Sequence, residues 1–131
     1  MIMIPIFEPD LSGNELKYVT DCIKEGWISS GGKYKEKFEE EFAKYCGVKY
    51  GIGVPSGTAA IHLAVVTLGI KNGDEVIIPD FTMIACALGV VYTGATPVFV
   101  DANPVTWTVD SKKIEEKITP KTKAIMPVHI Y

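Results

Sequence analysis

The segment Ser56-Gly57-Thr58 has the residue types and the order of an anion-binding turn. It follows an apolar run that predicts a strand and precedes an apolar run that predicts a helix. A helix begins with unpaired N–H groups and the positive end of its dipole, and glycine lets the backbone approach a ligand closely. Such a turn is suited to hold a phosphate, with the Thr58 hydroxyl as a further donor. The alternative is that Ser56 only caps the helix, and the residues alone leave both interpretations open.

Three further groups of residues with chemical potential follow predicted strands. They are Asp80-Phe81-Thr82-Met83, Asp101-Ala102-Asn103 and His129-Ile130-Tyr131. Ligands of open α/β sheets bind beyond the carboxyl ends of the strands. Together these groups supply carboxylates, an apolar platform and an imidazole. That combination is more typical of a cofactor pocket than of a protein-binding surface.

Other motifs give weaker matches. Gly51-Ile52-Gly53 begins like a dinucleotide-binding fingerprint, but Ser56 stands where the third glycine is needed. The acids Asp74 and Glu75 precede a predicted strand, whereas the fingerprint requires an acid at a strand's end. His62 lies in an apolar stretch and is interpreted as a core histidine. Two histidines are too few to predict a metal site, so we expect no bound metal.

Composition excludes several classes of protein. The chain has 131 residues, with 13 basic against 16 acidic side chains, and its lysines are scattered, which argues against a nucleic-acid or anionic-membrane surface. The apolar stretch Ala59–Ile70 is too short to span a bilayer, and Met1–Phe7 lacks the basic region of a signal peptide. Cys22, Cys46 and Cys86 form no paired pattern. They predict neither a disulfide framework nor a zinc site and indicate a reduced, cytoplasmic setting, with Cys86 as packing.

The first 47 residues predict two helices. A capping box at Ser12–Glu15 is expected to begin the first helix, and Gly26 to end it. Trp27–Gly32 is predicted to be irregular, with an exposed tryptophan. Apolar residues at helical spacing predict a second helix over Lys33–Cys46, stopped by the glycine that follows.

From residue 48 to residue 131, apolar runs of strand length alternate with helical runs. The expected strands are 48–54, 75–79, 96–101 and 123–129, and the expected helices are 58–68, 82–92 and 111–118, the last capped by Asp110. This alternation predicts an α/β fold with a mostly parallel sheet covered on both faces. The last strand has no helix after it to cover the sheet. We therefore expect the N-terminal part of a longer protein, or a sheet that a partner chain completes.

Six motifs occur in one order and spacing from about residue 5 to residue 131. They are Gly26–Gly32, Phe38–Ala43, Ser56–Ala64, Gly73–Pro79, Gly94–Asp101, and Thr122–Ile125 followed by Val128-His129. In this the chain resembles the N-terminal portion of the DegT/DnrJ/EryC1/StrS family of sugar aminotransferases, which use pyridoxal 5'-phosphate (PLP). The resemblance implies the aspartate-aminotransferase type of fold (PLP fold type I), here as an incomplete large domain. The rest of that domain and a small C-terminal domain would be absent. It also implies a homodimer.

The resemblance also implies the site residues. Gly57, Thr58 and Ala59 would bind the phosphate of PLP, in agreement with the argument from the helix terminus. Met83 stands where many members have an aromatic residue on the pyridine ring, and a thioether can pack there. The segment expected to approach the nucleotide-sugar substrate consists of Trp27, Ile28, Ser29 and Ser30.

The implied reaction moves an amino group from an amino acid, expected to be L-glutamate, to a nucleotide-linked keto sugar. The stretch Phe81–Ala85 resembles that of perosamine-synthase-like members and favours GDP-4-keto-6-deoxymannose. The lysine that forms the Schiff base with PLP is expected beyond Tyr131, so we expect the 131 residues alone to be inactive. The alternatives are a PLP-dependent sugar dehydratase with histidine in place of that lysine, a nicotinamide-dependent oxidoreductase and a non-catalytic fragment.

Overall fold

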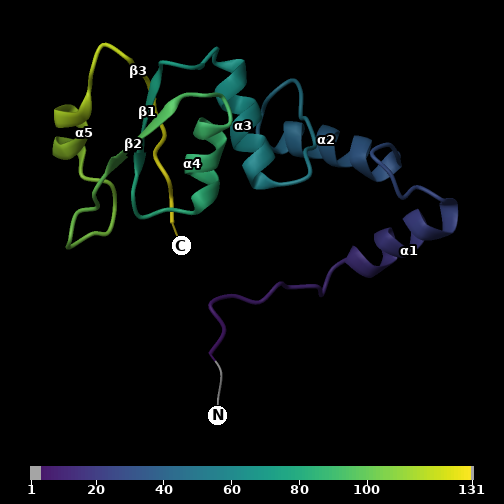
Figure 1. The fold of residues 1–131 in the computed structure, drawn as a ribbon. Coiled ribbons are helices and arrows are strands. Elements are labelled where there is room, and N and C mark those ends of the chain that lie inside the picture. The colour runs from purple at the N-terminus through teal and green to yellow at the C-terminus, as the bar shows by residue number, and fades with distance from the viewer. Residues whose placement is uncertain (1–3, 131) are drawn as a thin grey trace. The chain divides into compact units, whose positions relative to one another are not determined.

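The computed structural model describes residues 4–130 and divides the chain into two compact units, the first ending at Gly53 and the second beginning at Val54 (Figure 1). Two earlier expectations therefore fall partly outside the described residues. Met1 to Met3 belong to the start that was compared with a signal peptide, and Tyr131 belongs to the last of the groups that follow a strand.

The first unit contains two helices, α1 (Glu15–Glu25) and α2 (Lys33–Tyr45). The Tyr34 hydroxyl donates to Asp21 Oδ2 at 2.7 Å, and the rings of Tyr34 and Tyr18 lie 4.6 Å apart between centroids. These contacts link α1 to the first turns of α2. The irregular segment between the helices is confirmed, and Trp27 is exposed as predicted.

The sequence predicted the C-terminal ends of α1 and α2 correctly, but not the N-terminus of α1. Gly26 ends α1 in the left-handed region at φ 77°, and Gly47 follows α2 at φ 68°, so both stop signals are confirmed. The capping box was wrong. Asn14 is the N-cap of α1, and the Ser12 amide donates to Asp10 Oδ1 at 2.9 Å instead. Asp10 closes a local turn with its own side chain, and Ser12 lies two residues before the N-cap.

The predicted strand 48–54 was also wrong. Among the described residues this segment belongs to no strand. A strand exists only where a neighbouring strand supplies hydrogen-bond partners, and here the Gly53 amide donates to the Glu39 side chain of α2 at 2.7 Å.

The second unit is built on a parallel sheet in the order β2-β1-β3, with β1 (Glu75–Pro79) in the centre. Its neighbours are β2 (Thr96–Val100) and β3 (Thr122–Ile125). The predicted parallel α/β architecture is therefore confirmed. The strand β3 is shorter than predicted: the Met126 amide still donates to Ile77 O at 2.8 Å, but the next residue is Pro127, which has no N–H to continue the ladder.

Three helices accompany the sheet: α3 (Gly57–Thr67), α4 (Ile84–Val91) and α5 (Ser111–Lys117). Figure 1 shows α3 and α4 together on one side of the sheet and α5 on the other. The Asp110 cap of α5 is confirmed, because its carboxylate accepts the Lys112 amide at 3.0 Å. The helix α4 begins two residues later than predicted, since Met83 is extended at ψ 140° and forms its N-cap.

The core lies between α4, one face of α3 and the sheet. Its buried residues are Val65, Ile70, Val76, Ile78, Ala87, Val90 and Ala95. Although the sequence of α3 is apolar almost throughout, Val65 is the one residue of this helix that is buried. A helix that packs along one face leaves the rest in solvent, and the predicted core histidine, His62, is accordingly only half-buried, with its ring edge-on to Tyr92. Cys86 is buried as predicted.

None of the helices within residues 4–130 combines the length and the apolar character that crossing a bilayer requires.

Candidate functional site

The N-terminus of α3 has the local geometry that the sequence suggests for an anion-binding turn. Ser56 is extended at φ −160°, and its hydroxyl accepts the Ala59 amide at 3.2 Å, so its capping role is confirmed. The amides of Gly57 and Thr58 come before the first intrahelical donor and have no acceptor among the described residues. A Cβ on Gly57 would meet nothing within 4 Å, and the first turn carries no acidic side chain. The turn is therefore open, rich in donors and compatible with a phosphate group.

Met83 lies in the same unit, at the start of α4, which packs against α3. Its side chain is 61% exposed and is available to a ligand. The three predicted phosphate-binding residues and Met83 thus belong to two packed helices. Of the three, Ala59 already uses its amide within the cap, which leaves Gly57 and Thr58 as the free donors.

The carboxyl ends of the three strands meet at one edge, as the parallel topology predicts. A cavity of about 500 Å³ lies there, and its lining residues are Phe81, Thr106, Trp107, Thr108, Val128, His129 and Ile130. A smaller hollow of about 270 Å³ adjoins Asp80 and Asp101. The expectation that the groups following β1, β2 and β3 share an edge is therefore confirmed for the described residues.

Sequence reasoning missed Trp107. Its ring lies edge-on to Phe81 with 5.3 Å between centroids, and its backbone has a positive φ of 58°, which is costly for a residue with a bulky side chain. The only available signal was Asn103-Pro104, which is typical of a turn but does not show where the turn directs a tryptophan.

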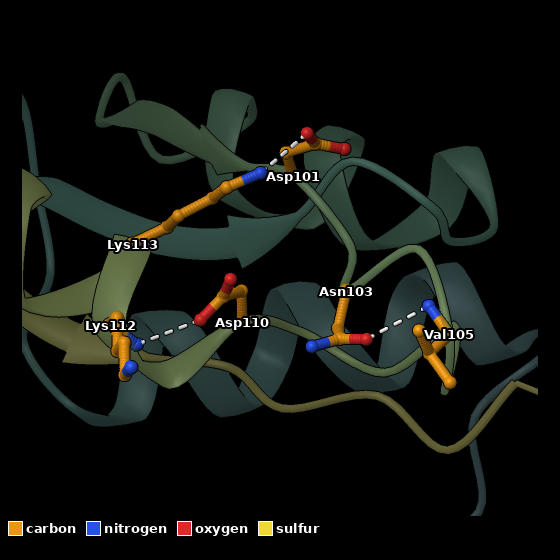
Figure 2. A network of polar contacts seen from close by, with 6 residues as sticks. All are labelled: Asp101, Asn103, Val105, Asp110, Lys112 and Lys113. Atoms are coloured by element: carbon orange, nitrogen blue, oxygen red, sulfur yellow. Dashed lines mark hydrogen bonds and ion pairs between the residues drawn. The ribbon is translucent and has the colours of Figure 1, made fainter.

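The loop that carries Trp107 is held by a polar network (Figure 2). Asn103 Oδ1 accepts the Val105 amide at 2.9 Å, and Lys113 Nζ lies 2.6 Å from Asp101 Oδ2. The Lys113 ammonium holds the pKa of Asp101 below its ordinary value, and Asp101 in turn raises the pKa of Lys113. Both groups stay charged at neutral pH. The ion pair therefore joins Asp101, which follows β2, to Lys113 of α5, and the loop with Trp107 lies between these two residues in the sequence.

The predicted substrate segment lies in the first unit, between α1 and α2. Trp27 is 51% exposed, and Ile28, Ser29 and Ser30 are exposed as well. Gly32 passes close beside the indole, since a Cβ on Gly32 would lie 3.4 Å from Trp27 Cβ. This segment belongs to the first unit, whereas the α3 turn belongs to the second.

The sequence profile of the DegT/DnrJ/EryC1/StrS aminotransferase family matches residues 9–131. The fold is that of an α/β protein with a parallel sheet and a donor-rich terminus at the start of α3. The chain belongs to the DegT/DnrJ/EryC1/StrS aminotransferase family.

Two curated relatives are GDP-perosamine synthases. The protein of Caulobacter vibrioides is 54% identical over 128 residues, which are 98% of this chain and 34% of that protein. The protein of Escherichia coli O157:H7 is 51% identical over 131 residues, which are 100% of this chain and 36% of that protein. The chain thus spans about a third of the length of the curated relatives that it matches.

Solved structures agree with the sequence relatives. Spr1654 of Streptococcus pneumoniae in its PMP form superposes with a TM-score of 0.84 at 35% identity, covering 95% of this chain and 31% of that chain. NtdA of Bacillus subtilis with bound cofactor PMP gives a TM-score of 0.79 at 41% identity, covering 88% of this chain and 26% of that chain. The fold class expected from the sequence is therefore confirmed.

Proposed function

We propose that this chain forms the N-terminal part of a PLP-dependent aminotransferase that acts on a nucleotide-linked keto sugar. The observation that carries the proposal is its 50–54% identity to three GDP-perosamine synthases over nearly all of its length. A second support is the open, donor-rich terminus of α3. It suits the phosphate of a cofactor that the similar protein NtdA binds as PMP.

Each predicted site residue has a role in this proposal. The Gly57 and Thr58 amides, with the Thr58 hydroxyl, bind the cofactor phosphate and fix the position of the cofactor. Ala59 completes the turn through its bond to Ser56, and Met83 packs against the cofactor ring. When bound, PLP supplies the electron sink for amino-group transfer.

The acceptor in this proposal is GDP-4-keto-6-deoxymannose and the donor is L-glutamate. The names of the GDP-perosamine synthases and the resemblance of Phe81–Ala85 to such enzymes support this choice. The exposed segment from Trp27 to Ser30 approaches the nucleotide sugar. In this proposal the enzyme is a homodimer and works in the cytoplasm. The lysine that anchors the cofactor covalently lies beyond Tyr131.

The test uses the complete natural polypeptide, loaded with PLP and followed by visible absorption. We expect a band of bound PLP that L-glutamate bleaches and that GDP-4-keto-6-deoxymannose restores, with an amino sugar nucleotide detected by mass spectrometry. A dTDP-linked 4-keto sugar serves as the comparison substrate. A folded protein that shows no PLP band contradicts the proposal. Restoration by the dTDP sugar alone contradicts the choice of nucleotide.

Borohydride reduction of the loaded protein then locates the anchoring lysine. We expect the reduced cofactor on a peptide beyond residue 131. A reduced cofactor on one of the 13 lysines of this chain would contradict the proposed division of the site.

A further inference from the structure

The segment Gly51–Gly53 lies unusually close to α2 within the first unit. A Cβ on Gly51 would lie 2.5 Å from the backbone oxygen of Glu39, and a Cβ on Gly53 would lie 3.3 Å from Glu39 Oε1. The first distance is shorter than any side chain tolerates. The two glycines that resembled part of a dinucleotide-binding fingerprint therefore serve a close approach between this segment and α2.

The Glu39 side chain fastens this segment. Its Oε1 accepts the Gly53 amide at 2.7 Å, and Lys35 Nζ lies 3.0 Å from the same oxygen. Only 19% of the Glu39 side chain is exposed. The Gly53 amide and then the Lys35 ammonium hold the pKa of Glu39 below its ordinary value. The carboxylate is therefore charged at neutral pH, and hydrogen bonds to a charged acceptor are stronger than neutral ones.

Gly53 is joined to the phosphate-binding turn by a very short piece of chain. Only Val54 and Pro55 separate it from Ser56, the N-cap of α3. Proline fixes its own φ and restricts the residue before it. Few backbone torsions thus remain free between the atom that Glu39 holds and the first free amides of the turn.

We infer that Glu39 is a positioning residue for cofactor binding: by holding the Gly53 amide, it fixes the chain that leads into the Ser56-Gly57-Thr58 turn. The inference rests on the proposed function, because the turn matters only if it binds the cofactor phosphate. Glu39 does not touch the cofactor in this scheme. Its effect is transmitted along the backbone and is specific to the phosphate end of the cofactor.

The experiment compares PLP with pyridoxal, which lacks the phosphate, in the complete natural polypeptide. Glu39→Ala removes the acceptor, Glu39→Asp keeps the charge but shortens the side chain, and Glu39→Gln keeps an acceptor oxygen without the charge. Glu40→Ala is the matched control, since Glu40 is an exposed neighbour on α2. Hydrogen exchange of the Gly53 amide provides a readout that does not involve the cofactor.

We expect Glu39→Ala and Glu39→Asp to raise the exchange rate of the Gly53 amide and to weaken PLP binding, each about tenfold, from the loss of one charge-assisted hydrogen bond. Pyridoxal binding should stay unchanged. Glu39→Gln should fall between these variants and the wild type, and Glu40→Ala should match the wild type.

Three results would overturn the inference. The first is that PLP and pyridoxal both bind Glu39→Ala and Glu39→Asp as tightly as the wild type, and the second is an equal loss of both affinities, which indicates a general effect on folding. If Glu39→Ala fails to fold, Glu39→Asp decides. The third is a wild-type protein that binds no PLP, which removes the proposed function as well. Faster Gly53 exchange with an unchanged affinity ratio removes only the positioning role.

Discussion

Tyr34 shows how a single hydrogen bond sets the titration of a side chain. Its hydroxyl donates to Asp21, and this hydrogen bond, followed by desolvation and the negative charge of Asp21, raises the pKa of Tyr34 from 10.0 to about 12. A group whose pKa is raised by folding contributes stability below its unfolded pKa. The Tyr34–Asp21 bond is therefore fully stabilising below pH 10 and is lost as the pH rises towards 12.

We predict that an alkaline titration followed by tyrosinate absorbance contains a late step, at about pH 12, that belongs to Tyr34. Tyr34→Phe should remove the late step, and Asp21→Asn should move it to lower pH because the acceptor loses its charge. A wild-type titration without a late component would contradict the bond.

Thr58 is the residue at which the proposed cofactor site is most easily tested. Thr58→Val keeps the shape of the side chain and removes one donor to the phosphate, so we expect PLP to bind about tenfold more weakly, with little change in pyridoxal binding. Thr67→Val is the control on the same helix, because the Thr67 hydroxyl donates to Leu63 O. Equal effects of the two substitutions on PLP binding would argue against a phosphate at Thr58.

At the scale of elements, the start of α3 combines a helix cap with the proposed anion site. Two substitutions of Ser56 test these two roles separately. Ser56→Ala should lower the free energy of unfolding by about 1 kcal/mol, because the Ala59 amide loses its acceptor. Ser56→Asp should retain the cap and the stability, yet weaken PLP binding, because its carboxylate repels the phosphate. Chemical denaturation and PLP titration measure the two effects. Unchanged PLP affinity in Ser56→Asp would speak against the anion site.

The packing of α3 on α4 depends on Gly89. This residue is buried in α4, and a Cβ there would lie 2.5 Å from Ile61 Cγ2 and 3.2 Å from the backbone nitrogen of His62. Alanine is the better helix former, but the clash with α3 outweighs that preference.

We therefore predict that Gly89→Ala lowers the free energy of unfolding by about 1–3 kcal/mol. In an Ile61→Ala background, which removes Cγ2, the nearest atom, the same substitution should cost less, as a double-mutant cycle would show. A stabilising effect of Gly89→Ala in the wild-type background would contradict the close packing.

At the scale of the whole molecule, the central strand carries the core of the second unit. Val76, Ile77 and Ile78 of β1 have no exposed surface. Ile78→Ala should lower the free energy of unfolding by about 2–5 kcal/mol, through lost burial and the cavity that remains. Ile118→Ala is the control, since Ile118 is 55% exposed, and its effect should stay within about 0.5 kcal/mol. Similar effects of both substitutions in urea denaturation would contradict this account of the core.

The sequence by itself determined the features that depend on neighbours along the chain. The left-handed stops at Gly26 and Gly47 follow from the conformations that glycine permits, and the Asp110 cap follows from a side chain that reaches an amide two residues away. The strand at residues 75–79 and the parallel direction of the strands follow from apolar runs separated by helices. The family also follows from the sequence, because its motifs depend on residue order.

Only the tertiary structure decided which residues distant in sequence meet. It left segment 48–54 without a strand partner, gave the Gly53 amide to Glu39, exposed most of α3 and placed Trp107 against Phe81. Each of these features depends on which hydrogen-bond partners and side chains the other elements place next to the segment. A pattern of residue types records the preference of a segment, but pairing, burial and close approach depend on the neighbours that folding brings beside it.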